Sequence, residues 1–310
     1  MSAPLLGIIL TLLFVGLEAV QFVYFGGLFQ NVNPFFFGAM VFSVTVLLLW
    51  GWAAAFCRPE LTAARRNLPL VIRVNLAAAA ASGAYLASVA LVEPAVVYTV
   101  SAGAMPLVMW ALHHYGTPEA EAPRNRMETI GCVLLLISIA YLCIITIIGL
   151  SGFVRGGLRA GVGGIVLALI DGTAFALVLI YSKRLGVLGI SAGVILGLRM
   201  ILYVIIAAAV SAAVVDKTEM MSSSELATML AIGLIVTLPP LYAFQKAVTL
   251  ISALTLSVLT TLGPFAIFGL QILEGRVEYS NATLLGLCIY SAGALLAAWG
   301  AMSGTRIRRE

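Results

Sequence analysis

The chain has 310 residues, of which 62% are apolar or aromatic and only 10% are charged, with a formal net charge of +4. Soluble proteins contain about 45–50% apolar and about 25% charged residues, so the composition excludes a cytosolic enzyme, a secreted disulfide-stabilised domain and a nucleic-acid-binding protein. Together with a mean hydropathy of +1.11, it predicts a multi-pass membrane protein that has the lipid bilayer as its main partner.

Ten apolar stretches follow one another along the chain, each of about 20 residues, the length that an α-helix needs to cross a bilayer. The predicted helices span residues 4–26, 35–56, 68–91, 94–113, 128–150, 161–183, 190–214, 226–246, 252–273 and 281–303. The stretches lack the polar residue at every second position that a barrel strand would carry. We therefore predict an all-α polytopic membrane protein with ten transmembrane helices.

The distribution of Lys and Arg between alternate loops predicts the orientation, because cytoplasmic loops carry an excess of both. With the N-terminus in the cytoplasm, the cytoplasmic set is Arg58, Arg65, Arg66, Arg124, Arg126, Lys183, Arg184, Lys246, Arg306, Arg308 and Arg309. The outer set is Arg155, Arg159, Lys217 and Arg276. We predict a multi-pass protein of the cell (inner) membrane with both termini in the cytoplasm.

The second half of the chain repeats the first at an offset of 157 residues. Identical residues at this offset include Gly7 and Gly164, Ala19 and Ala176, Tyr24 and Tyr181, Tyr85 and Tyr242, and Ala90 and Ala247. The register predicts two five-helix repeats, residues 1–150 and 161–310 with a short basic tail, joined by an outer linker at 151–160. Because five is odd, the second repeat is inverted in the membrane, an arrangement that permits alternating access about a site near the midplane. The alternative is duplication of a purely structural bundle.

A series of motifs in the second repeat is similar to a known family. It runs Tyr242-Ala243-Phe244-Gln245-Lys246-Ala247, Ser252-Ala253, Leu262-Gly263-Pro264, Leu273-Glu274-Gly275, and then Gly286 and Gly293. The chain resembles the drug/metabolite transporter superfamily in its ten-helix EamA-type branch, although the pair Glu274-Gly275 is reversed from the usual Gly-Glu. The first repeat matches more weakly, through Tyr85, Pro94-Ala95 and Pro106. The resemblance implies a ten-helix transporter of small organic solutes.

Interrupted helices at matching positions of two repeats indicate a transporter's binding site. Pro239-Pro240 interrupts the eighth helix, and Ser82-Gly83 lies at the matching position of the third. Both pairs weaken the helical hydrogen bonding and leave carbonyl groups for a ligand, an ion or water. The predicted substrate-binding residues are Gln21, Ser82, Tyr85, Pro106, Pro239, Tyr242 and Pro264, with Pro106 and Pro264 bending the fourth and ninth helices. The alternative is that these prolines are ordinary kinks.

Charges within the predicted spans are the second indication of a site, because an ionisable group there costs about 2.5–3.5 kcal/mol on insertion scales. Glu18, Asp171 and Arg199 are such residues. Glu18 lies one turn beyond the repeat counterpart of Asp171, so both acids are expected at similar depth and form the predicted proton-coupling group with Arg199. Alternatively, Arg199 pairs with one acid as a packing clamp, or reaches the cytoplasmic interface. Glu93-Pro94 is interpreted as a tight outer turn.

Motifs of soluble catalysis and nucleotide binding are absent from the sequence, so we expect neither an enzyme nor a cofactor or metal site. The favoured function is export of a small organic metabolite or drug by proton antiport. The alternative is a facilitative or uptake carrier for amino acids or other metabolites without proton coupling. Two further alternatives are an intramembrane enzyme and a receptor or assembly subunit. Small residues on the last helix, such as Gly286 and Gly293, permit a homodimer.

Overall fold

A computed structural model describes residues 3–120, 122–213, 222–251 and 259–306 of the chain. All regular secondary structure in these residues is helical, apart from one isolated β-bridge between Val92 and Val154. The helices are α1 (Ala3–Leu28), α2 (Pro34–Phe56), α3 (Arg58–Arg66), α4 (Leu68–Leu91), α5 (Pro94–His114), α6 (Arg126–Ile147), α7 (Gly157–Val187), α8 (Ala192–Arg199), α9 (Ile201–Ala213), α10 (Ser223–Leu250), α12 (Gly263–Glu274) and α13 (Asn281–Arg306).

Nine apolar helical segments in the described residues are long enough to cross a membrane. Many of their large apolar side chains are exposed, among them Leu47 at 71% and Phe56 at 77%. Contiguous apolar surface of this kind is rare on soluble monomers, whereas lipid tails solvate it. The chain is therefore a multi-pass membrane protein, as its composition predicts.

Two predicted helices differ from the structure. The stretch at 190–214 forms two helices, α8 and α9, which meet at Met200. The break is stabilised from another helix, because the Asn75 side chain in α4 accepts a hydrogen bond from the backbone N–H of Leu202 at 3.1 Å. The predicted helix at 252–273 is seen as the shorter α12, and residues 252–258 lie outside the described part of the chain.

The loop after α2 also contains a short helix, α3, that the hydropathy pattern did not predict, because its sequence Arg-Pro-Glu-Leu-Thr-Ala-Ala-Arg-Arg is polar. Glu60 in α3 accepts a hydrogen bond from the backbone N–H of Ser191 at 2.7 Å, at the start of α8. This contact fixes α3 against the N-terminus of α8, which favours negative charge.

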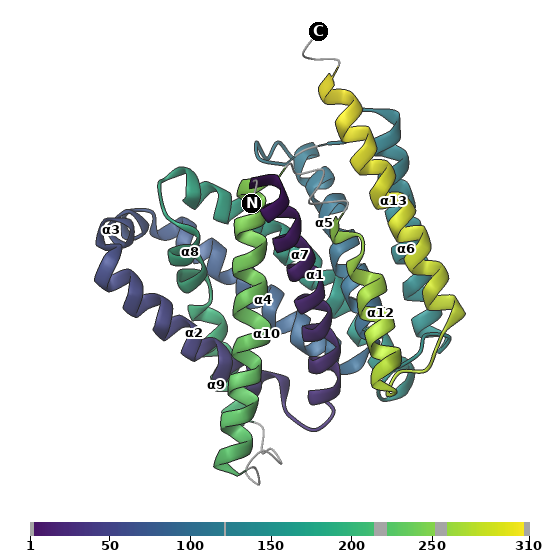
Figure 1. Ribbon diagram of the computed structural model, residues 1–310, viewed down its shortest axis with the longest axis horizontal. Coiled ribbons are helices and arrows are strands. Elements are labelled where there is room, and N and C mark those ends of the chain that lie inside the picture. Colours follow the sequence, from purple (N-terminus) through teal and green to yellow (C-terminus); the bar gives the residue numbers. More distant parts are fainter. Residues whose placement is uncertain (1–2, 121, 214–221, 252–258, 307–310) are drawn as a thin grey trace.

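Helix packing joins elements that are far apart in sequence. α1 packs against α10 and α12, and α7 packs against α4 and α5. α2 packs against α9, and α6 lies side by side with α13 along one edge of the molecule (Figure 1). In the same view α1 begins, and α13 ends, toward the upper side.

The close packing of α6 on α13 depends on small residues. A Cβ atom on Gly131 of α6 would lie 2.6 Å from the Gly293 carbonyl oxygen, and one on Gly286 would lie 2.4 Å from a Leu142 methyl group. Gly286 and Gly293 are the residues that the sequence offered as a dimer face. In the structure they lie against α6 of the same chain, so they are not free to contact a partner.

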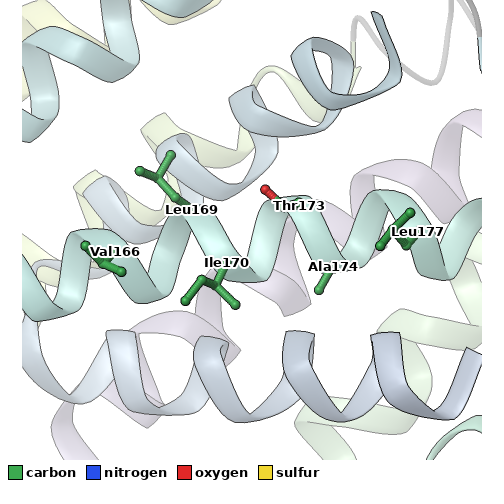
Figure 2. Close-up of a pocket in the computed structure, with 6 residues that line it drawn as sticks. All are labelled: Val166, Leu169, Ile170, Thr173, Ala174 and Leu177. Carbon is green, nitrogen blue, oxygen red and sulfur yellow. The ribbon is translucent and has the colours of Figure 1, made fainter. Parts of the chain in front are cut away.

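One side of α7 faces outward. Figure 2 shows the residues there that line a shallow apolar hollow of about 320 Å³: Val166, Leu169, Ile170, Thr173, Ala174 and Leu177. Val166 and Ile170 are exposed, while Asp171 on the same helix is buried. α7 therefore presents an apolar face to lipid and an acidic residue to the interior.

Candidate functional site

A cavity of about 490 Å³ lies among the helices, within the size range of small-molecule sites. Its lining comes from α1, α2, α4, α5, α6, α7, α8, α10 and α13, with Met200, Thr260 and Thr261 from the connecting segments. The structure brings together seven of the predicted site residues in this lining: Glu18, Gln21, Ser82, Tyr85, Pro106, Asp171 and Arg199. Residues from both halves of the sequence thus share one cavity.

Three predicted site residues lie elsewhere. The cavity face of α10 consists of Thr237, Pro240, Leu241 and Phe244, a spacing that marks one side of a helix. Pro239 and Tyr242 are on the opposite side, and Tyr242 is 69% exposed. Tyr242 therefore lies outside the cavity in which the prediction placed it, and Pro240 lines the cavity in place of Pro239.

Pro264 is also placed differently from the prediction. It is the second residue of α12, where a missing N–H costs nothing, and it is buried outside the cavity lining. In the described residues it therefore lies at the start of α12, directly after a turn at 261–262 that follows the helical residues 259–260. Pro106, in contrast, lies inside α5 and lines the cavity, as predicted.

The two acids lie in a polar part of the cavity. The Ser101 hydroxyl donates a hydrogen bond to Oδ2 of Asp171 at 2.6 Å. The Tyr98 hydroxyl donates one to the Glu18 carboxylate, and Oε2 of Glu18 is buried without a hydrogen-bond partner. A buried acid oxygen without a partner is costly, so this atom is available to a ligand, a proton or water.

Arg199 ends α8 beside the break at Met200. Its Nε atom is buried and has no hydrogen-bond partner. Among the described residues no ion pair joins Arg199 to Glu18 or to Asp171. The structure thus does not contain the packing clamp that the sequence left open, and the cavity holds two acids and one basic residue that form no ion pair with each other.

Each charged residue of the lining has a phenylalanine at the position 157 residues away. Phe14 matches Asp171, Phe175 matches Glu18 and Phe42 matches Arg199, and all three phenylalanines also line the cavity. Matching positions of the two halves therefore contribute to the same cavity wall. The charges themselves are not duplicated, so the two sides of the cavity differ chemically.

Tyr98, Ser101 and Tyr290 are lining residues that the sequence analysis missed. The α5 residues of the lining are Tyr98, Ser101, Ala102, Met105 and Pro106. Their spacing marks one helix face, and Tyr98 and Ser101 stand out on it as polar, so this pattern was the signal available in the sequence.

Another buried acid lies at the end of the bundle where α4 leads into α5. Glu93 is 0% exposed. Its carboxylate accepts hydrogen bonds from the Gly152 N–H at 2.9 Å, from the Thr283 hydroxyl at 2.9 Å and from the Gln271 side-chain amide. Burial raises the pKa of Glu93, and these three hydrogen bonds act in the opposite direction. The predicted outer turn is therefore also a hydrogen-bonded junction, which the sequence analysis did not find.

The described residues contain no group of three or more His, Cys, Asp and Glu side chains that could hold a metal ion. The chemistry that the cavity offers is binding of charged and aromatic groups, together with proton uptake and release by two carboxylates.

Comparison with known proteins supports the fold. No family model matches the chain, and no curated protein matches it. Among the solved structures that match, one described as "Crystal structure of protein" superposes with a TM-score of 0.61 over 95% of this chain and 96% of that chain, at 16% sequence identity. At this identity the likeness concerns the fold alone, and it extends over nearly the whole of both chains.

Proposed function

We propose that the chain is a secondary transporter that moves a small organic metabolite or drug across the membrane by alternating access. The observation that carries the proposal is the cavity within a bundle of membrane-length helices, with Glu18 carrying a buried carboxylate oxygen that has no partner. Buried ionisable groups inside a membrane protein usually mark a substrate or ion pathway. The proposal agrees with the resemblance to EamA-type transporters.

The packing of the helices supports two inverted repeats. In the predicted repeats α1 corresponds to α7, α4 to α10 and α5 to α12. The contact of α1 with α10 therefore has its counterpart in the contact of α7 with α4, and the contact of α1 with α12 has its counterpart in that of α7 with α5. All four contacts occur. A Cβ atom on Gly7 would lie 2.4 Å from a methyl of Ile251, and one on Gly164 would lie 2.2 Å from a methyl of Val92. These matching glycines thus make the same kind of contact, each with the C-terminal end of a neighbouring helix.

Proton antiport is the proposed coupling, in the direction of export. Glu18 and Asp171 would bind protons when the cavity faces one side and release them when substrate enters from the other. Tyr85, Ser82 and Gln21 line the cavity and would contact the substrate, and Arg199 would balance the charge. The cell inner membrane, with both termini in the cytoplasm, is the proposed location, and the start of α1 and the end of α13 on one side of the bundle are consistent with it.

The second candidate is a facilitative or uptake carrier without proton coupling. In that case the two acids would bind only a cationic group of the substrate, and their loss would abolish binding at every pH. The Ser101 hydrogen bond to Asp171 is consistent with this role, because it holds the carboxylate in a fixed position in the cavity wall. The Glu18 oxygen without a partner favours proton coupling.

The test has two steps. Purified protein is first screened by thermal shift against amino acids, nucleosides, polyamines and cationic dyes. The compound with the largest shift is then added to proteoliposomes that contain a pH-sensitive dye. We expect substrate movement to be accompanied by proton movement in the opposite direction, and the variant Glu18→Gln with Asp171→Asn to lose the proton signal. Proton coupling that stays complete in this double variant would contradict the mechanism.

A further inference from the structure

The junction around Glu93 lies between the cavity and one end of the bundle. Glu93, the residue before α5, precedes the lining residue Tyr98 by five residues, and on α13 Thr283 precedes the lining residue Tyr290 by seven. At about 1.5 Å per residue, the junction is one to two helical turns from the cavity on both helices. It is therefore placed where a transporter must open and close the path to its site.

The hydrogen bonds of the junction cross between elements that are separate in sequence. Glu93 precedes α5, Gly152 belongs to the loop between α6 and α7, Gln271 belongs to α12 and Thr283 to α13. The Gln271 side-chain oxygen also accepts a hydrogen bond from the Ala95 N–H at 3.2 Å, so this amide is bonded at both of its ends. Glu93, Gln271 and Thr283 are all completely buried. Separation of α5 from α12 and α13 at this end requires these bonds to break.

The matching position of the other half carries no acid. Leu250 lies 157 residues after Glu93, at the end of α10, and its Cβ would lie 3.0 Å from a Cβ on Gly7 of α1. The contact there is apolar. The buried carboxylate is thus present at this position in only one of the two halves.

We propose that Glu93, with Gln271 and Thr283, forms the closed gate at this end of the transport path, and that its hydrogen bonds break when the cavity opens on that side. The inference rests on the proposed transport function. Glu93 does not touch substrate in this account; it is a positioning residue that sets the balance between the two access states. Weakening the junction is expected to shift that balance toward opening at the Glu93 end.

The test measures access to the cavity from each side of the membrane. Ala102, a cavity-lining residue, is replaced by cysteine in full-length protein whose native Cys57, Cys132, Cys143 and Cys288 are replaced by alanine. Labelling by a membrane-impermeant maleimide is followed in right-side-out and inside-out vesicles. In Glu93→Gln the amide group replaces one acceptor oxygen, so one buried donor loses its partner in the closed state only.

We expect Glu93→Gln to increase labelling from the Glu93 side about tenfold, the effect of one lost hydrogen bond, and to decrease labelling from the opposite side. A residue that only stabilises the fold would increase labelling from both sides or from neither, and either result would overturn the proposal. Glu278→Gln, an exposed acid at the same end, is the matched control and should change neither rate.

Thr283→Val, which removes one donor and keeps the carboxylate, is the second variant and applies if Glu93→Gln does not fold. It should change both rates in the same directions as Glu93→Gln, by a smaller factor, and unchanged rates would overturn the proposal. The labelling requires no substrate. If proton-coupled transport is not observed but Glu93→Gln changes the two labelling rates in opposite directions, the coupling mechanism is refuted and the gate stands. If transport is observed but the labelling rates do not change in opposite directions, only the gate is refuted.

Discussion

Glu18 and Glu93 both carry carboxylate groups inside the helix bundle, and their surroundings differ. Glu93 is completely buried, whereas Glu18 is partly exposed along the cavity. Glu93 accepts hydrogen bonds from three donors that belong to three different elements. Glu18 has one oxygen without any partner, and that oxygen lies in a cavity large enough for a small solute. The two residues therefore differ in exposure and in the number of hydrogen bonds that their carboxylates accept.

The difference has an energetic meaning. A buried carboxylate that is fully hydrogen-bonded recovers much of the cost of leaving water, and its loss leaves donors without acceptors. A buried carboxylate with an unpartnered oxygen costs stability, and proteins keep such costs mainly at functional sites. We therefore assign Glu93 to closing and stabilising one end of the bundle, and Glu18 to the chemistry of the cavity.

The largest expected effect on stability comes from removing the side chain of Glu93. Glu93→Ala leaves the Gly152, Thr283 and Gln271 donors without their acceptor, and we expect the free energy of unfolding to fall by about 3–5 kcal/mol. Chemical unfolding in detergent micelles measures it. A loss below about 1 kcal/mol would mean that water replaces the carboxylate and that Glu93 is less different from Glu18 than the structure indicates.

Asp171 should lie between the two extremes. It has one donor where Glu93 has three, but unlike Glu18 it has no oxygen that is both buried and without a partner. Ser101→Ala removes that donor, and we expect a loss of about 1–2 kcal/mol in the free energy of unfolding. Asp171→Asn keeps an acceptor oxygen for Ser101 and serves as the control, with a loss of less than about 1 kcal/mol. If the two variants behave alike, the hydrogen bond does not account for the position of Asp171.

Glu18→Gln should have little effect on stability and a large effect on function. The amide keeps an acceptor for Tyr98 and removes an ionisable group that is costly to bury, so the melting temperature should stay the same or rise, within about 1 kcal/mol of stability. The substrate-linked proton signal should disappear. A fall in melting temperature as large as that of Glu93→Ala would show that Glu18 is a structural acid.

The smallest expected effect on stability concerns Glu119, a solvent-accessible acid that serves as a reference for Glu18 and Glu93. Glu119 forms two hydrogen bonds with Arg184, at 2.9 and 2.6 Å, and these lower its pKa. An acid with a lowered pKa stabilises the fold above its ordinary pKa and loses this contribution as the pH falls through the lowered value. The melting temperature of the wild type should therefore exceed that of Arg184→Gln slightly at neutral pH. The difference should vanish in strong acid, and a difference that grows on acidification would be inconsistent with this pairing.

The sequence predicted most of the helices, because each apolar run is long enough to cross a bilayer. It missed the break at Met200, because the acceptor for the Leu202 N–H comes from Asn75. A contact between residues so far apart leaves no local pattern. The polar helix α3 was missed for the opposite reason, since hydropathy reports membrane segments and not interfacial ones.

The candidate site was predicted best where charge identified it. Glu18, Asp171 and Arg199 were found because charge is rare in membrane helices, and all three line the cavity. Tyr242 was misplaced because a matching position in a repeat does not fix which face of α10 turns inward. Glu93 was interpreted only as a turn, since its three donors come from distant parts of the chain.

The central claim is that Glu18, which has an oxygen without a hydrogen-bond partner, takes part in transport, whereas Glu93, which accepts three hydrogen bonds, closes one end of the bundle. The most direct test measures proton movement and melting temperature together for Glu18→Gln and Glu93→Ala, with the compound selected by the thermal-shift screen. We predict that Glu18→Gln abolishes the proton signal at unchanged stability, and that Glu93→Ala lowers stability strongly. Full proton coupling in Glu18→Gln, or equal losses of stability in the two variants, would contradict the claim.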